Sequence, residues 1–254
     1  MSDQLIHLDD GSHIRWQDPV WDFKSMGWRT RELLEVNPLS SEVTPTLIAR
    51  LDEVNLRDKI RLCYGRIPAE SRHLIDAFST AGFIYVESSY NISISKMQPF
   101  EPETVGRVIP LRMACAEDKE AIGNISARDF HHGRILEDVN VPEDLARKRN
   151  RHWIEDLYRY ANIWVCEIRG EVVGFHAFQR KKNEAKMILT GLKSGCEPLA
   201  GLFWRSVMAQ TTSEGISNAT TTISANNIAI VNIYSWLGFR VDELLIGLHK
   251  HYSV

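Results

Sequence analysis

One short segment in the second half of the chain carries several side chains that could do chemistry close together. These residues are His131, His132, Arg134 and Asp138. An imidazole titrates near neutral pH, so His131 or His132 could take a proton from an attacking ammonium group. Arg134 offers a fork of hydrogen-bond donors to an anionic or hydroxylated molecule, and Asp138 offers acceptor oxygens. A surface ion pair explains Arg134 and Asp138 equally well, and for either histidine alone a solvated loop position is the more common state, so both interpretations stay open.

A second stretch, residues 219–243, has the pattern of a strand, a helix and another strand. The β-branched residues from Thr220 to Ser224 predict a short buried strand, and Asn227 ends a polar break that can cap a following helix. Gly238 stands where a left-handed C-terminal cap is expected, and Phe239 begins the next strand. The apolar stripe that predicts the helix is Ile230, Ile233, Tyr234 and Leu237.

This pattern resembles the C-terminal half of the GNAT superfamily of N-acetyltransferases. The residues that match the pattern are Asn227, Ile233, Tyr234, Gly238 and Phe239. The resemblance implies acetyl-CoA as cosubstrate, with Asn227 contacting the acyl-coenzyme A arm and Tyr234 protonating the departing thiolate. The alternative is that Tyr234 is a core residue whose hydroxyl bonds to the backbone.

The chain repeats part of this stretch. Residues 78–87 align without a gap on residues 234–243, and each segment follows a predicted strand and helix. The first copy has Phe78 where the second has Tyr234. A phenyl ring cannot donate a proton, so acid catalysis is expected only in the second half.

A further resemblance is to the TDP-fucosamine N-acetyltransferase branch of the same superfamily. The segment from His132 to Asp138, Pro142 and the run from Trp153 to Glu155 carry it. That branch also has an incomplete GNAT-like half in front of a complete one, so the resemblance covers nearly the whole chain. It implies a nucleotide-linked amino sugar as acceptor, although Gly133 and Ile135 depart from the motif.

The turn expected to bind the coenzyme A pyrophosphate departs from the family. In a GNAT domain, backbone N–H groups of a glycine-rich turn hold that group at a helix N-terminus. In the corresponding segment, 191–201, closely spaced glycines are missing and Glu197 adds a negative charge. Gly195 and Lys193 compensate in part. We expect the free N–H groups at the helix start to come from Leu199, Ala200 and Gly201.

Two other side chains have reactive potential. His176 lies on a strand predicted to cross the middle of the sheet, which makes it a candidate base, although such a histidine is more often hydrogen-bonded in a core. Cys196 has no neighbouring base in the sequence, so no thiol nucleophile is predicted.

The element pattern predicts an α/β protein of two GNAT-like halves, with mixed sheets flanked by helices. Residues 95–106 hold two prolines among polar neighbours, as linkers do. We therefore expect an incomplete GNAT-like N-terminal domain at 1–102 and a complete catalytic GNAT domain at 107–254. The predicted strands are 59–67, 107–113, 162–168, 171–179 and 184–192, and the predicted helices are 44–55, 68–81, 117–130, 142–160 and 198–212.

Composition narrows the partners. The chain has 254 residues, a net charge of -3 and four dispersed cysteines, so nothing attracts nucleic acid or an anionic membrane, and neither a metal site nor a disulfide framework is implied. The amino terminus lacks an apolar leader, which predicts a cytoplasmic protein. A homodimer stays open as a further possibility.

Together these patterns predict an N-acyltransferase that moves an acyl group, in the first instance acetyl, from coenzyme A to the amine of a nucleotide-linked amino sugar or a similar small amine. A backbone N–H near Leu192 would stabilise the oxyanion. Two alternatives remain: an acyl carrier protein as donor, or a non-catalytic GNAT-like binding protein.

Overall fold

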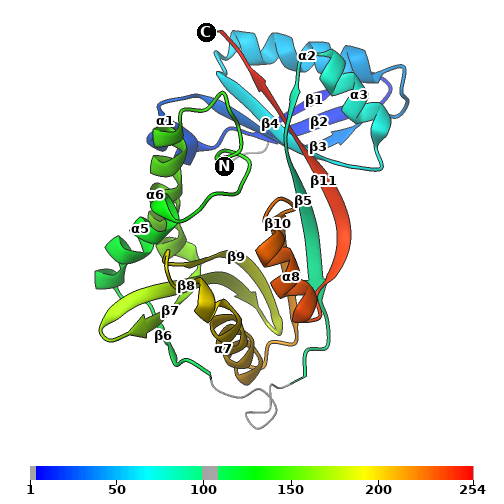
Figure 1. The fold of residues 1–254 in the computed structure, drawn as a ribbon. Helices are drawn as coiled ribbons and strands as arrows, with labels where there is room; N and C mark the ends of the chain where they lie inside the picture. Colours follow the sequence, from blue (N-terminus) through cyan, green and yellow to red (C-terminus); the bar gives the residue numbers. More distant parts are fainter. Residues whose placement is uncertain (1–3, 99–107, 254) are drawn as a thin grey trace.

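The structure is a computed structural model that describes residues 4–98 and 108–253. Its centre is one 11-stranded sheet with the order β1-β2-β3-β4-β11-β5-β10-β9-β8-β7-β6 (Figure 1). The first half contains β1 Gln4–His7, β2 His13–Gln17, α1 Val20–Met26, β3 Thr30–Asn37, α2 Thr44–Arg57, β4 Leu62–Pro68, α3 Arg72–Thr80 and β5 Ile84–Ile94. The second half contains β6 Leu111–Met113, η1 Ala116–Asp118, α5 Lys119–Arg128, α6 Glu143–Tyr160, β7 Asn162–Ile168, β8 Glu171–Lys181, β9 Glu184–Leu192, η2 Glu197–Leu199, α7 Ala200–Ser213, β10 Asn218–Ser224, α8 Ile228–Trp236 and β11 Arg240–His251.

The predicted α/β architecture of two similar halves is confirmed, and most predicted elements form. The strand expected from residue 107 begins only at Leu111, because Pro110 has no N–H to join the ladder. Residue 107 itself lies outside the described residues. The elements that were not predicted include β1 and β2 near the amino terminus, α1 within the aromatic-rich stretch 16–28, and β3 in a charged stretch without clear alternation.

The two halves exchange their last strands. β5 pairs with β10 of the second half, whereas β11 pairs with β4 of the first half, and the two exchanged strands pair with each other. The exchange reaches the cores: Ile92 of β5 packs in the second-half core, and Leu248 of β11 packs in the first-half core. In Figure 1 both long strands run between the halves. The predicted boundary between 102 and 107 lies outside the described residues, and the division into domains there stays a prediction.

The predicted repeat is confirmed in three dimensions. Phe78 and Phe83 meet edge to face with ring centroids 4.8 Å apart, and Tyr234 and Phe239 do the same at 4.8 Å. In each copy the N–H of the second ring's residue donates to the carbonyl of the first at 3.0 Å. The glycine before the second ring has φ +88° in the first copy and +89° in the second, as a left-handed helix cap requires.

A bulge in the second half separates two neighbouring strands. β9 and β10 run parallel but pair only from Glu184↔Asn218 to Lys186↔Thr220. Two residues further along β9, the register against β8 shifts and leaves Ile188 without a partner on β8. A bulge bends and twists its strand, so β9 leaves β10 at this point. The two strands form the sides of a cleft.

Helices α5 and α6 cover the β7–β8 region with a core of their own. The N-terminal turn of α6 carries two acidic residues, which its positive end favours. α6 also reaches the first half: Arg149 donates to Asp22 of α1 at 2.5 Å, and Lys24 of α1 donates to Glu155 at 2.9 Å. Among the described residues, none of the helices has the length and apolar character that crossing a bilayer would need.

Candidate active site

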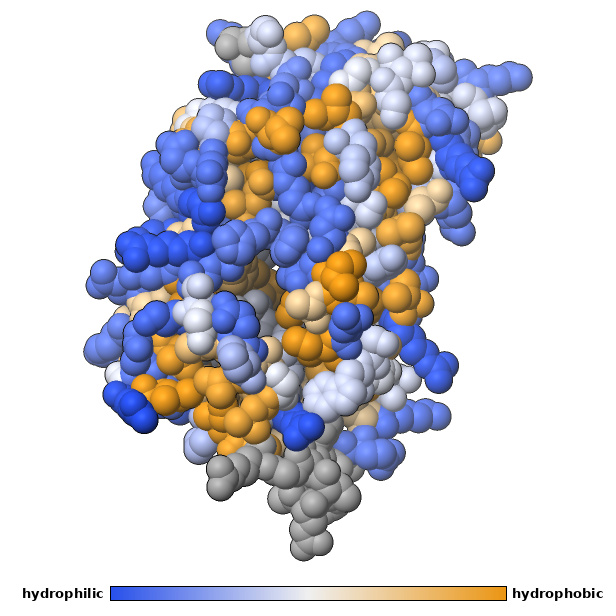
Figure 2. All heavy atoms as spheres, in the orientation of Figure 1, coloured by the Kyte–Doolittle hydropathy of each residue, from blue (hydrophilic) through white to orange (hydrophobic). Residues whose placement is uncertain are grey.

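A cavity of about 1030 Å³ lies where the halves meet. Its lining comes from β9, β10 and α8, from the 131–138 loop that joins α5 to α6, and from α1, α6, β4 and β5. Figure 2 shows a recess at this level of the molecule. The volume is that of a large small-molecule site.

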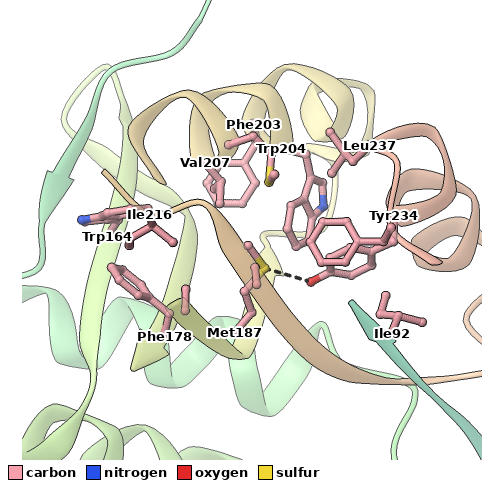
Figure 3. Close-up of a cluster of buried hydrophobic side chains, with 14 of the residues drawn as sticks. Ile92, Trp164, Phe178, Met187, Phe203, Trp204, Val207, Ile216, Tyr234 and Leu237 are labelled. Atoms are coloured by element: carbon pink, nitrogen blue, oxygen red, sulfur yellow. Dashed lines mark hydrogen bonds between the residues drawn. The ribbon is translucent and has the colours of Figure 1, made fainter. Parts of the chain in front are cut away.

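Tyr234 lies in the cavity wall between the diverging strands. Its side chain packs edge to face on Trp204 at 4.7 Å, and its hydroxyl points at Met187 Sδ at 3.9 Å (Figure 3). Burial raises the pKa of the phenol well above its ordinary value, and side-chain hydrogen bonding with Thr221 and Thr190 opposes part of that rise. The phenol is therefore protonated at neutral pH and is available as a proton donor.

His176 is buried behind this wall. Its Nδ1 lies 2.8 Å from Thr190 Oγ1, and Thr190 lines the cavity. The imidazole is enclosed by the rings of Trp164 and Trp204, with centroids 5.8 and 6.0 Å away. Burial lowers its pKa to about 3, so the ring is neutral. The His176 side chain is not among those that line the cavity, whereas its partner Thr190 is.

Asn227 caps α8 as the sequence predicts. Its Oδ1 accepts a hydrogen bond from the N–H of Ile230 at 3.2 Å. Within the part of the chain that the structure describes, its amide nitrogen has no partner, and the residue lines the cavity. Asn227 therefore presents a donor to the cleft while it fixes the start of the helix that carries Tyr234.

The edge of β9 beyond Lys186 is open toward the cavity. Because pairing with β10 stops there, no strand in the described part of the chain pairs with Met187 to Leu192 on that side, and all these residues line the cavity. Such an edge can bind an extended chain through main-chain hydrogen bonds. Gly191 allows close packing from behind, because a Cβ on it would lie 2.5 Å from the Phe130 ring.

The turn after β9 differs from the prediction. The N–H groups of Leu199 and Ala200 are not free, because a single 3-10 turn precedes α7 and they donate to the carbonyls of Cys196 and Glu197. In α7, Gly201 comes one residue after Ala200. Gly195 donates its N–H to the Glu197 carboxylate at 3.0 Å, and of these residues only Glu197 lines the cavity. A carboxylate thus occupies a backbone donor that a phosphate would use.

The 131–138 loop brings His131, His132 and Arg134 to the cavity. Arg134 is 18% exposed, donates to Glu32 of β3 at 2.7 Å, and lies 4.4 Å over the Tyr64 ring of β4. Burial opposes its charge, but Glu32 outweighs burial and raises the pKa of the guanidinium. Both partners of Arg134 belong to the first half.

Glu137 holds the same loop to the second half. Its carboxylate accepts hydrogen bonds from Ser224 Oγ at 2.8 Å and Asn226 Nδ2 at 2.5 Å, and His132 Nδ1 lies 3.9 Å from it. The loop is therefore fixed on both sides of the cavity, which keeps the histidines beside the β10–α8 turn.

Asp138 does not join Arg134 at the cavity wall. It is 2% exposed, and one carboxylate oxygen lies 2.6 Å from His249 Nδ1 and 2.8 Å from His251 Nε2. Burial opposes ionisation, but these hydrogen bonds lower the pKa of the carboxyl. Although the three residues carry metal-ligand atoms within 4.8 Å, contacts this short to a single oxygen are hydrogen bonds. Asp138 ties the loop to β11.

Comparison with solved structures gives matches over nearly the whole chain at low identity. A GCN5-related N-acetyltransferase from Sphaerobacter thermophilus has a TM-score of 0.68 and 13% identity, over 97% of this chain and 79% of that chain. A tandem GNAT protein from the clavulanic acid biosynthesis pathway, solved without AcCoA, has a TM-score of 0.64 and 11% identity, over 99% of this chain and 84% of that one. The chain has the tandem GNAT fold.

A functionally unknown conserved protein from Staphylococcus epidermidis shares this fold, with a TM-score of 0.70 and 10% identity over 99% of this chain and 95% of that chain. No model of a protein family matches the sequence, and no curated protein matches it. The GNAT likeness is thus one of fold, and the TDP-fucosamine branch is not shown by these structures.

The first half of the tandem GNAT fold contributes cavity residues that the sequence did not single out. Arg66 of β4 reaches across β11 to the buried Glu87 of β5, at 2.7 Å. Gly247 of β11 makes room for this ion pair, because a Cβ there would lie 2.8 Å from Glu87 Cγ. Only the strand exchange places these residues together, so no sequence motif could have found them.

Proposed function

We propose that the chain is an N-acyltransferase that moves an acyl group, acetyl in the first instance, from coenzyme A to the amine of a small molecule. The observation that carries the proposal is the position of Tyr234, whose hydroxyl lies in the cavity wall where β9 and β10 diverge. A protonated phenol at the end of an open strand edge is suited to a thioester whose sulfur must leave as a thiol.

The proposed reaction is direct transfer. The amine attacks the thioester carbonyl, and a backbone N–H near Leu192 stabilises the oxyanion of the tetrahedral intermediate. The intermediate collapses, the carbon–sulfur bond breaks, and Tyr234 gives its proton to the thiolate. His132 takes the proton that the amine loses. His132 suits this role because it lines the same cavity and Glu137 lies 3.9 Å away.

The donor would lie along β9. The open edge from Met187 to Leu192 suits an extended pantetheine arm. The Asn227 amide nitrogen, which has no partner among the described residues, suits one of its carbonyls. The pyrophosphate would lie by Gly195 and the start of α7 at Leu199, Ala200 and Gly201. That end fits less well, because Glu197 already occupies the Gly195 N–H. This observation favours a second candidate donor, an acyl carrier protein, whose pantetheine ends in a single phosphate.

The acceptor would lie between the 131–138 loop and the first half. His131 and Arg134 line this part of the cavity, and a guanidinium can bind a phosphate or sugar hydroxyl, as a nucleotide-linked amino sugar requires. Asp138 would support this loop through its contacts with His249 and His251 of β11. Retention of Tyr234 argues against the third reading, a non-catalytic GNAT-like binding protein.

The test is an assay of thiol release from acetyl-CoA and from acetyl carrier protein with a panel of amines that includes nucleotide-linked amino sugars. Arg134→Ala is expected to raise the acceptor KM roughly 10- to 100-fold, the value of a hydrogen bond to a charged group, and to leave donor KM nearly unchanged. Equal loss of donor affinity would show that Arg134 only supports the fold. No turnover with any donor and amine, together with no donor binding, would leave the non-catalytic reading.

A further inference from the structure

The bulges in the two halves allow a residue-by-residue comparison of the sites. In the first half, β2 and β3 shift register at Leu34, as β8 and β9 do at Ile188. Two positions beyond each bulge, the first half pairs Ile14 with Val36, and the second half pairs His176 with Thr190. The polar pair therefore has an apolar counterpart at the same place in the sheet.

The next strand gives the same result. The last pair between β9 and β10, Lys186↔Thr220, corresponds to Glu32↔Tyr64 between β3 and β4. The first half then adds one more pair, Leu33↔Gly65, so Gly65 corresponds to Thr221. The repeat already aligns Phe78 with Tyr234. The polar groups Tyr234, Thr190, Thr221 and His176 thus replace Phe78, Val36, Gly65 and Ile14.

Comparing the two halves shows which of these side chains the fold itself requires. Ile14 and His176 are equally buried, at 0% and 1% exposure, so the architecture accepts an aliphatic side chain at this position. Burying an imidazole costs free energy unless its polar atoms are bonded. The second half carries that cost, and the contact of His176 Nδ1 with Thr190 Oγ1 at 2.8 Å offsets part of it. A function beyond folding would explain why it does so.

We propose that His176 and Thr190, together with Thr221, are positioning residues that hold the Tyr234 hydroxyl with its proton directed at the leaving sulfur. His176 donates its Nδ1–H to Thr190 Oγ1, which leaves the Thr190 hydroxyl hydrogen free to donate to the phenol oxygen. The phenol oxygen then accepts from the threonines, while its own hydrogen points at Met187 Sδ, 3.9 Å away on the cavity lining, a weak partner that the leaving sulfur would replace. This inference rests on the proposed function and adds the residues that orient its acid.

The same arrangement acts on the transfer step. When the sulfur takes the proton, the O–H bond of Tyr234 breaks, an S–H bond forms, and the charge passes from the thiolate to the phenolate oxygen. The hydroxyls of Thr190 and Thr221 donate to that phenolate and stabilise it. Water in the cavity then returns a proton to the phenolate.

The first experiment replaces a residue of the second half by the residue that the first half has at the corresponding position. Thr190→Val, which installs the residue found at Val36, is expected to lower kcat roughly 10- to 100-fold with little change in donor KM, because a hydrogen bond to a charged group is lost. Thr190→Ser keeps the hydroxyl and should recover most of that loss. The matched control is Val36→Thr, which should leave kcat unchanged. Equal kcat values for the valine and serine variants would overturn the proposal.

The second experiment tests whether His176 and Thr190 act through Tyr234. His176→Ile copies Ile14 and is expected to lower kcat several-fold, and in a Tyr234→Phe background neither His176→Ile nor Thr190→Val should lower kcat further. If the losses multiply in that background, the two residues act on stability or elsewhere, and the proposal is wrong. If His176→Ile does not fold, the Thr190 pair of variants decides alone.

Failure here differs from failure of the proposed function. If turnover depends on Tyr234 but not on Thr190, the proposed acyltransferase function stands and the positioning role of His176, Thr190 and Thr221 is wrong. If turnover does not depend on Tyr234, Tyr234 is not the general acid, and the positioning role falls with it.

Discussion

The first and second halves build the same strand, bulge, helix and glycine-capped turn, yet they fill it differently. Around Phe78 the equivalent positions are apolar, and around Tyr234 they hold hydroxyls and an imidazole. Shape is therefore what the fold requires, since both fillings give buried rings at the same 4.8 Å spacing. We propose that the polar groups of the second half mark the place of the chemistry.

The clefts also differ. In the first half, a Cβ added to Gly65 would lie 2.8 Å from Leu33 Cβ. The Leu33 side chain therefore covers the point that corresponds to the separation of β9 and β10. In the second half the corresponding residues, Met187 and Thr221, both line the cavity. We therefore propose one acyl-donor site per chain.

The largest expected effect comes from making the second site resemble the first. Tyr234→Phe is expected to lower kcat ~10²- to 10⁴-fold, as loss of a general acid does, without loss of folding. Tyr85→Phe, at an exposed tyrosine outside the cavity, is the control. Measured under conditions where the chemical step limits turnover, equal rates for wild type and Tyr234→Phe would contradict the assignment of the acid.

The reverse change sharpens the comparison. Phe78→Tyr places a hydroxyl among Leu74, Phe83 and other apolar side chains of the first-half core. A buried hydroxyl without a partner costs about 1–3 kcal/mol, so urea unfolding should show a loss of that size with turnover unchanged. A variant as stable as wild type would mean that the first half offers the new hydroxyl a hydrogen-bond partner, which would contradict the apolar character assigned to that site.

The third prediction concerns pH. Folding lowers the pKa of His176 to about 3, so below its ordinary pKa of 6.5 the unfolded chain binds a proton that the folded chain does not, and stability falls as pH falls toward 3. Between pH 7 and 5.5 this contribution is about 1 kcal/mol. His176→Ile removes it, so the variant should lose about 1 kcal/mol less than wild type over that range in urea titrations. His249, whose pKa burial also lowers, contributes equally to both proteins. Parallel losses would show that His176 does not titrate this way.

The smallest expected effect concerns the turn after β9. Glu197→Gly removes a carboxylate and frees the N–H of Gly195, so coenzyme A should bind several-fold more tightly, with a larger gain at low salt because ions screen exposed charges. Calorimetry at two salt concentrations measures it. An unchanged affinity, with acyl carrier protein preferred by both proteins, would favour the carrier-protein donor.

Local patterns predicted the second half well. Asn227, Tyr234 and Gly238 carry their signals within one segment, because caps and helical stripes depend on neighbours in sequence. The strand exchange could not be predicted, since an exchanged β11 has the same sequence pattern as one that pairs within its own half. Asp138 shows the same limit: its spacing from Arg134 suggests a shared role, but its partners lie on a strand more than a hundred residues away.

The most direct test of the central claim is the number of acetyl-CoA molecules that one chain binds. Titration calorimetry of the purified protein should give one site per chain, located in the second-half cleft. The control Val36→Thr should leave that number unchanged. Two sites would contradict the closed first-half cleft, and no binding at millimolar acetyl-CoA would contradict coenzyme A as the donor.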